Sequence, residues 1–284
     1  MARVGAQSPG LLFGTAGVPA SSRKPDTASG VEAVARLGLG AMELEFVRGV
    51  RLSARLAARV RDNAERLGVA LTCHGPYYIN LNAREAEKVA ASEKRILDTA
   101  RAASLVGARS ITFHAAFYLQ DDPETVHRRV RERLGGILEQ LARENISVQV
   151  RPETTGKPSQ YGTLEELLRL SRELPGVQPC IDFAHLHARG GGGVNRAAEF
   201  RRVLEQVASA LGERALSDLH LHVSGIDYGD KGERKHLMLA DADFRYRQLL
   251  RELKRAGAGG ILICESPDPE ADALLLQKTY HQVN

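Results

Sequence analysis

The sequence repeats one unit, a short apolar run followed by a longer amphipathic run, and this repeat restricts the possible folds more than any other feature. The apolar runs, expected to be strands, cover residues 11–15, 41–46, 69–74, 110–114, 146–153, 178–185, 219–223 and 260–265. The amphipathic runs, expected to be helices, cover residues 31–37, 52–67, 85–106, 123–143, a segment opened by the capping-box pattern Thr163-Leu-Glu-Glu166, then 196–211, 243–255 and 270–278.

Eight such units without a break in composition favour an α/β fold, a closed (β/α)8 TIM barrel. We expect a single domain over residues 11–284, preceded by a short loose tail at 1–10. The alternative is a doubly wound open sheet, which would carry Gly-x-Gly-x-x-Gly after its first strand. The stretch Phe13-Gly-Thr-Ala-Gly17 does not supply that motif, so the barrel is preferred.

The composition indicates in which compartment the protein works and which charge its partner carries. No run of about 18 apolar residues is present, and the first residues lack an apolar core, so we expect neither a membrane segment nor a secretory signal. The thiols of Cys73, Cys180 and Cys264 lie in apolar runs, which is typical of free cysteines in the cytoplasm. A formal charge of +4 and a pI near 9.0 mildly favour an anionic partner such as nucleic acid.

Imidazoles and carboxylates recur where the expected strands end. In a barrel the carboxyl ends of all strands meet at one rim, so we expect these side chains to converge. Taken singly, each is more often a hydrogen-bonded core histidine or a glutamate at a loop junction. Together they would repel unless cations lay among them, which predicts a site for zinc, manganese or iron. The residues are His74, His114, Glu153, Asp182, His185, His222 and Glu265.

The number of expected ligands exceeds what one tetrahedral ion needs. Two or more ions about 3.5–4 Å apart suit displacement at phosphorus, which favours phosphoester hydrolysis. No Gly-x-Ser-x-Gly elbow or P-loop is present to suggest another nucleophile. His220 shares a strand face with His222 and is its rival, and Glu43 and Glu45 share a face of the second strand.

Several short motifs fall at the same strand ends, and through them the chain resembles the endonuclease IV family of apurinic/apyrimidinic endonucleases, within the xylose-isomerase-like barrels. The resemblance covers nearly the whole chain. It implies an enzyme of DNA base-excision repair that uses a trinuclear zinc cluster to cut DNA 5′ to an abasic site, leaving a 3′-hydroxyl and a 5′-deoxyribose phosphate. The motifs are Cys73-His-Gly-Pro-Tyr-Tyr-Ile-Asn-Leu81, Thr112-Phe-His114, Pro152-Glu-Thr-Thr-Gly156, Cys180-Ile-Asp-Phe-Ala-His185, His222 and Cys264-Glu265.

The resemblance also assigns the ligands. It implies a first ion on His74, His114 and Glu153, a second on Glu153, Asp182, His222 and Glu265, and a third on His185 and His236. Glu153 would bridge two ions and orient the attacking hydroxide, so it is the expected catalytic residue. We expect two or three Zn²⁺ ions per chain, with Mn²⁺ possible.

One position departs from the family pattern. The third ion usually takes a carboxylate two residues before its last histidine, but here that residue is Arg234, which cannot ligate a metal. Three alternatives stay open at this point: Glu233 or Asp230 replaces the carboxylate, the third site is weak or absent, or Arg234 itself holds the scissile phosphate.

The expected partner is double-stranded DNA that contains abasic sites, bound by a monomer. The resemblance implies that Tyr77 holds the abasic nucleotide out of the helix, and the loop after the second strand puts Arg48 in reach of the base stack. Asn80 and the cations at 231–235 are expected to contact the backbone. The expected DNA contacts are Tyr77, Arg48, Asn80, Lys231, Arg234 and Lys235.

Two competing functions remain. Sugar isomerases and epimerases of the same barrel type need only Glu153, Asp182, His222 and Glu265 around a single ion, which leaves four histidines without a role. A metal-bearing DNA-binding protein without catalysis is the third possibility. The histidines favour the nuclease.

Overall fold

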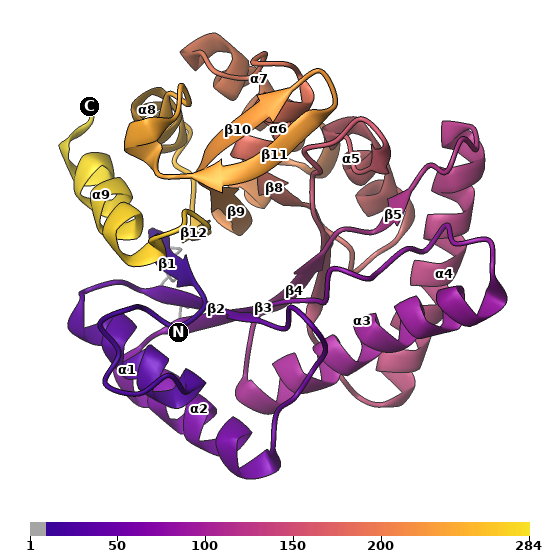
Figure 1. Ribbon diagram of the computed structural model, residues 1–284, viewed down its shortest axis with the longest axis horizontal. Coiled ribbons are helices and arrows are strands. Elements are labelled where there is room, and N and C mark those ends of the chain that lie inside the picture. Colours follow the sequence, from indigo (N-terminus) through magenta and orange to yellow (C-terminus); the bar gives the residue numbers. More distant parts are fainter. Residues whose placement is uncertain (1–9) are drawn as a thin grey trace, which may run out of the picture.

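Eight parallel strands form a closed barrel in the computed structural model, which describes residues 10–284 (Figure 1). Their order around the barrel is β6-β4-β3-β2-β1-β12-β9-β8. The ring closes between β6 and β8 by backbone hydrogen bonds, among them Thr154 N to Cys180 O at 3.0 Å. The barrel prediction is therefore confirmed. The strands are β1 (Leu11–Ala16), β2 (Ala41–Glu45), β3 (Ala70–His74), β4 (Ser110–Phe113), β6 (Gln149–Pro152), β8 (Cys180–Asp182), β9 (Leu219–Val223) and β12 (Gly260–Cys264).

Helices surround the barrel and begin and end at recognisable signals. Thr163 and Glu166 form the expected capping box at the start of α5, and Gly68 and Gly107 end α2 and α3 in the left-handed conformation. The largest differences from expectation are at three boundaries: α1 begins four residues earlier, α8 begins three residues later at Tyr246, and α9 ends four residues later at Gln282. The outer helices are α1 (Thr27–Arg36), α2 (Ala54–Leu67), α3 (Ala86–Val106), α4 (Pro123–Arg143), α5 (Leu164–Glu173), α7 (Ala197–Leu211), α8 (Tyr246–Arg255) and α9 (Pro269–Gln282).

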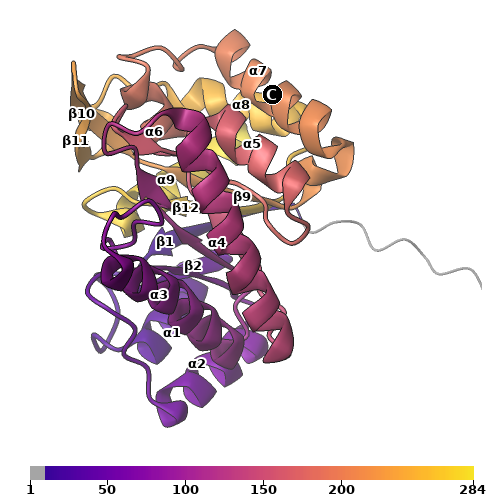
Figure 2. The same cartoon turned by 90° about the vertical axis from the view of Figure 1, so that its right-hand side faces the viewer.

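The apolar pattern does not predict the short elements that follow the strands. The sixth strand is only three residues long, and Phe183 to His185, expected within it, open a helix instead. The segment after β9, to which the sequence assigned neither strand nor helix, is an antiparallel hairpin that lies in front of α6 in Figure 1 and at one edge of the molecule in Figure 2. These elements are α6 (Phe183–Arg189), β10 (Gly225–Gly229), β11 (Gly232–Leu237), the strand pair β5 (Ala116–Phe117) and β7 (Gln160–Tyr161), and the 3₁₀ turns η1 (Glu213–Ser217) and η2 (Leu239–Asp241).

The expected loose tail at 1–10 lies outside the described residues except for Gly10, which bridges Gly259. No helix within residues 10–284 is both long enough and apolar enough to span a bilayer. The thiols of Cys73, Cys180 and Cys264 are free and buried. The cytoplasmic location stays a prediction.

The barrel interior changes character along its axis. Ala41, Ala70, Ile261 and Ile263 form a small apolar cluster inside the ring, separate from the main core between strands and helices. Because side chains alternate along each strand, the next inward residues on β2 and β3 are polar, and the strands end in ionisable groups. The polar end of the barrel is therefore the end at which a ligand site can form.

Candidate metal centre

The first group of possible ligands joins β3, β4 and β6. His74 Nε2 lies 3.2 Å from Glu153 Oε2, and His114 Nε2 lies 3.3 Å from the same oxygen. The ligand atoms of the three residues all lie within 4.8 Å of one another. Two imidazole nitrogens and one carboxylate oxygen in so small a space form a donor set suited to zinc.

The second group shares Glu153 with the first. His222 Nδ1 lies 3.2 Å from Glu153 Oε1 and 3.3 Å from Glu265 Oε1, and Asp182 completes the set within 4.8 Å. Asp182 is held as the N-cap of α6, where one carboxylate oxygen accepts from His185 N at 2.7 Å. Its other oxygen is buried and has no hydrogen-bond partner within residues 10–284, so a cation would satisfy it.

The third group lies between α6 and the hairpin. His185 Nε2 is 3.5 Å from Glu233 Oε2 and 3.5 Å from His236 Nε2, and the three ligand atoms lie within 4.8 Å. Glu233 therefore occupies the place for which the family pattern uses a carboxylate one residue later. Of the alternatives left open by the sequence, the geometry supports the one in which Glu233 reaches in.

A β-bulge explains how Glu233 and His236 share a face although they are three residues apart. Lys235 pairs with Asp227 and Glu233 pairs with Tyr228, so Arg234 is an extra residue in β11. The bulge restores the alternation, and the two ligands point to the same side of the hairpin. Arg234 is directed elsewhere: its Nη1 lies 3.7 Å from Asp227 Oδ1, and 63% of its side chain is exposed.

Two glycines make room for this arrangement. A Cβ on Gly156 would lie 2.7 Å from both Cβ and Oε2 of Glu233, so a larger residue there would displace the carboxylate. Gly232 has φ +82°, and a Cβ on it would clash with the main-chain oxygen of Gly156. Glu233 N also donates to Gly156 O at 2.9 Å, which joins the hairpin to the loop after β6.

Main-chain carbonyls orient three of the imidazoles. The Nδ1 atom lies 2.7 Å from Gly75 O in His74, 3.0 Å from Thr154 O in His185 and 2.9 Å from Glu265 O in His236. An N–H at Nδ1 satisfies each carbonyl and leaves the Nε2 lone pair for a cation. The three Nε2 atoms all face the ligand groups described above.

The carboxylates and imidazoles strongly shift one another's pKa values. Burial acts to lower the pKa of His74, but its hydrogen bond to Glu153 and the charge of Glu45 raise it to about 10. Burial acts to raise the pKa of Glu265, but the charge and hydrogen bond of His222 lower it to about 2. Without a cation, the raised pKa of His74 favours a proton on its imidazole beside Glu153, and a bound metal would replace that proton.

Two acidic groups have the opposite shift. Burial raises the pKa of Asp182 to about 6, against the opposing charge of His185. Burial also raises the pKa of Glu45 to about 8. Burial disfavours the charged form of both carboxyls, and the charges of Glu265 and Glu153 on Asp182, and of Glu43 and Glu265 on Glu45, add to the rise. A divalent cation beside these carboxyls would favour their charged form. The donor atoms, their spacing and the buried unpaired oxygen of Asp182 all fit metal ions.

Most of the expected DNA-contacting residues are exposed near this end of the barrel. Tyr77 is 59% exposed, and its ring centroid lies 6.0 Å from that of His74. Arg48 is exposed in the turn after β2, and Lys231 and Lys235 are exposed on the hairpin. The cations expected at 231–235 therefore lie in the turn of the hairpin and on its outer face.

Asn80 differs from the other expected contacts because the protein itself uses its amide oxygen. That oxygen accepts from Asn82 N at 3.0 Å and from Phe117 N at 3.2 Å. The side chain thus joins the loop after β3 to β5, which positions the segment that carries Tyr77. Whether Asn80 also contacts DNA stays a prediction.

Two glutamates on β2 enter the centre although strand-end position did not select them. Glu43, Glu45 and Glu265 have ligand atoms within 4.8 Å of one another. Alternation along β2 predicts that Glu43 and Glu45 share a face. Glu43, however, lies two residues before the end of the strand, so it is deeper in the barrel than the strand-end ligands. Glu233 was visible only as one of several substitutes. His220 lies deeper than His222, with Nε2 3.0 Å from Glu43 Oε2.

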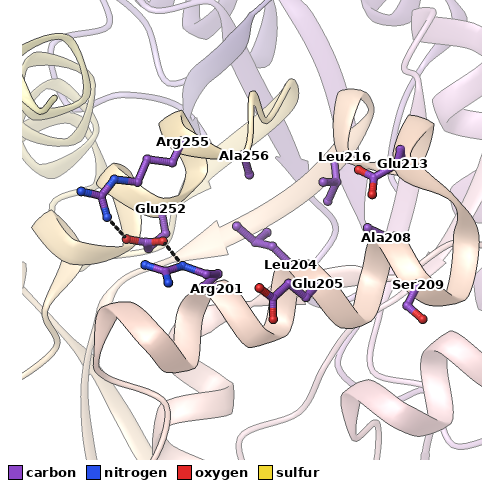
Figure 3. Close-up of a pocket in the computed structure, with 10 residues that line it drawn as sticks. All are labelled: Arg201, Leu204, Glu205, Ala208, Ser209, Glu213, Leu216, Glu252, Arg255 and Ala256. Atoms are coloured by element: carbon purple, nitrogen blue, oxygen red, sulfur yellow. Dashed lines mark hydrogen bonds and ion pairs between the residues drawn. The ribbon is translucent and has the colours of Figure 1, made fainter.

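A separate groove of about 620 Å³ lies on the outer layer, between α7, α8 and η1 (Figure 3). Its most buried charged group, Glu252, accepts from Arg201 Nε at 2.9 Å and from Arg255 Nη1 at 2.8 Å. This carboxylate is paired on both sides, and the groove contains none of the candidate metal ligands. The candidate metal ligands therefore lie at the barrel end and not in this groove.

Comparison with known proteins establishes the family. A family model described as a xylose isomerase-like TIM barrel matches residues 31–279. The chain belongs to this family. An uncharacterized protein of Methanocaldococcus jannaschii is 44% identical over 96% of this chain and 98% of its own length.

Two more distant relatives of this chain are named as nucleases. An apurinic-apyrimidinic endonuclease of Caenorhabditis elegans is 27% identical over 57% of this chain and 41% of its own length. A probable endonuclease 4 of Chlorobium phaeobacteroides is 24% identical over 77% of this chain and 78% of its own length. The expected resemblance to endonuclease IV within the xylose-isomerase-like barrels is confirmed.

Solved structures of both functional classes share the fold. Endonuclease IV from Thermus thermophilus has a TM-score of 0.72 at 23% identity, covering 96% of this chain and 100% of its own. A D-tagatose 3-epimerase-like protein has the same TM-score, 0.72, at 16% identity, covering 96% of this chain and 97% of its own. The fold alone therefore does not separate nuclease from epimerase, and the side chains must.

Proposed function

We propose that this protein is a metal-dependent endodeoxyribonuclease that hydrolyses the phosphodiester 5′ to an abasic site in double-stranded DNA. The observation that carries the proposal is the position of Glu153. Its Oε2 faces His74 and His114, while its Oε1 faces His222 at 3.2 Å. One carboxylate between two ligand groups is the arrangement expected for two neighbouring ions that act on one phosphate.

The third ligand group supports the same proposal. A single-ion enzyme has no use for His185, Glu233 and His236, yet the bulge in β11 and the small size of Gly156 bring them together. When bound, divalent ions would lower the pKa of water and neutralise charge on the phosphate. The protein's part is to fix the ligands: backbone carbonyls and the N-cap of α6 hold the side chains in place before substrate arrives.

The surface around the centre suits DNA. Tyr77 is exposed beside His74, where its ring can stack in the space left by a missing base. Arg48, Lys231 and Lys235 are exposed cations that can contact phosphates. Turning an abasic nucleotide out of the duplex requires little energy, because no base pair is lost.

A decisive test is a nicking assay on a duplex that carries one abasic site, with an identical undamaged duplex as control. We expect the zinc-loaded protein to cut only the abasic strand and to leave a 3′-hydroxyl that a DNA polymerase can extend. Glu153→Gln should lose most of this activity while keeping the fold measured by circular dichroism. An abasic duplex that stays intact with fully metal-loaded protein contradicts the proposal.

A single-ion sugar isomerase or epimerase is the second candidate. Glu153, Asp182, His222 and Glu265 form a complete four-ligand group by themselves, and epimerase-like structures share the fold. Metal analysis separates the two functions: two or three ions per chain support the nuclease, and a single ion supports the isomerase. Exchange of a sugar C–H proton with solvent deuterium would support the isomerase independently.

A further inference from the structure

Glu43 lies directly below the second ligand group, in the interior of the barrel. It is fully buried, and its Oε1 lies 2.9 Å from His222 Nε2, on the side of the ring away from Glu153 and Glu265. Both atoms are buried and without a well-aligned hydrogen bond to any group of residues 10–284. The carboxylate is thus at hydrogen-bond distance from Nε2 but off the straight N–H direction, so the bond requires a change in the orientation of the ring or of the carboxylate.

His222 differs from the other oriented imidazoles in how it is held. His74, His185 and His236 place Nδ1 against main-chain carbonyls and direct Nε2 to the centre. His222 is reversed, because Nδ1 faces Glu153 and Glu265 while Nε2 faces a side chain. The ring nitrogens of His185 also approach a carboxylate, with Nδ1 3.2 Å from Glu153 Oε1, but His185 has the Thr154 carbonyl as well. Among these four residues, His222 is the one with only side-chain partners at its ring nitrogens within residues 10–284.

Other groups fix Glu43 itself in place. Thr72 Oγ1 donates to Glu43 Oε2 at 2.7 Å, and His220 Nε2 lies 3.0 Å from the same oxygen. His220 Nδ1 in turn lies 3.2 Å from Ser110 Oγ. The carboxylate therefore has one oxygen engaged by the barrel wall and the other left for His222.

We propose that Glu43 is a positioning residue that accepts from the Nε2–H of His222 and so directs the Nδ1 lone pair of His222 to the second metal ion. The proposal requires only that His222 bind a metal. It therefore holds for the nuclease and for the single-ion isomerase alike, and it can fail or succeed independently of the DNA assay.

The expected effect is a loss of metal affinity. Without the carboxylate, the two neutral tautomers of His222 become closer in energy, and the form with a proton on Nδ1 cannot ligate. Removing such a partner commonly weakens metal binding about 10–100-fold. We expect that loss for Glu43→Leu at the second group. Glu43→Gln keeps an oxygen that can accept from Nε2–H and should recover a large part of the affinity.

The experiment compares zinc affinity of the full-length variants by competition with a chromophoric chelator. Thr112→Val is the matched control, because it changes a buried residue of the neighbouring strand β4 whose hydroxyl has no hydrogen-bond partner within residues 10–284. We expect Thr112→Val to bind zinc within about 3-fold of the parent, far less than the 10–100-fold loss for Glu43→Leu. Parent-like affinity in a folded Glu43→Leu protein overturns the proposal.

A second measurement does not depend on any variant folding. Long-range proton–nitrogen correlation spectra of ¹⁵N-histidine in the zinc-loaded parent report which ring nitrogen carries the proton. We expect a proton on Nε2 and the metal on Nδ1 for His222, with the reverse for His74, His185 and His236. A proton on Nδ1 of His222 would exclude the role assigned to Glu43.

Discussion

The barrel strands and the β10–β11 hairpin supply candidate ligands in different ways. On the strands, ligands lie at the carboxyl ends of regular β structure, so alternation and strand order suffice to bring His74, Glu153 and Glu265 together. On the hairpin, regular alternation would place Glu233 and His236 on opposite faces, and only the bulge at Arg234 unites them. Ligands on regular strands can therefore be selected from alternation and strand order, whereas alternation alone does not place Glu233 and His236 together.

The largest expected effect on metal binding comes from a ligand at the end of a barrel strand, Glu153. Glu153→Gln removes charge from a carboxylate that two ligand groups share, so we expect both groups to lose at least about 100-fold in zinc affinity. The hairpin group should keep its ion, because it does not include Glu153. Zinc content after dialysis, measured by mass spectrometry, checks this. Loss of a single ion would show that the two groups are independent.

The hairpin side is tested by Glu233→Gln with Arg234→Ala as its neighbouring control. The first removes the carboxylate 3.5 Å from His185 Nε2, and we expect one ion to be held about 10–100-fold more weakly. The second removes an exposed side chain directed at Asp227 and should leave metal content unchanged. A zinc titration monitored by calorimetry distinguishes the two variants. If Arg234→Ala also loses an ion, the bulge does not have the role described here.

Deleting Arg234 tests whether the bulge serves to place Glu233 and His236 on one face. Deletion removes the extra residue and leaves Glu233 and His236 two positions apart on a regular strand, where they share a face. We expect the third ion to remain bound within about 10-fold of the parent, a smaller effect than removing a ligand partner. The same zinc titration serves as the measurement. A loss as large as that of Glu233→Gln would contradict this account.

The pKa shifts predict a smaller, pH-dependent effect on the strand ligands. The pKa of His74 is raised to about 10, so its imidazole is protonated at pH 7 and must release that proton to bind zinc. Affinity should therefore rise with pH between 7 and 10, and zinc binding in weakly buffered solution should release protons. Acid release measured by a pH electrode tests this. An uptake of protons on zinc binding would contradict this prediction.

The smallest expected effect concerns the outer face of the hairpin. Lys235→Ala removes one exposed cation, which should weaken binding to abasic and intact duplexes alike and reduce the salt dependence by about one ion. Metal content should stay unchanged, because Lys235 pairs with Asp227 on the face away from the ligands. Fluorescence anisotropy over a range of salt concentrations provides the measurement. An effect confined to abasic DNA would indicate a specific contact instead.

The sequence by itself determined the barrel, most of its helices and the strand-end side chains. Thr163 and Glu166 mark the start of α5, and Gly68 and Gly107 end their helices, because caps and left-handed positions depend on local chemistry. His74 and His222 could be selected because strand ends in a parallel barrel meet at one rim. These features follow from local propensity and from a regular repeat.

Only the tertiary structure decided how Glu233 and Glu43 take part. Glu233 enters because of an extra residue in β11, a missing side chain at Gly156 and a backbone bond between two distant loops. Glu43 is brought to His222 by barrel closure, which places residues far apart in sequence within 2.9 Å. Neither contact has a local signature, because each depends on the packing of segments that come together only when the chain is folded.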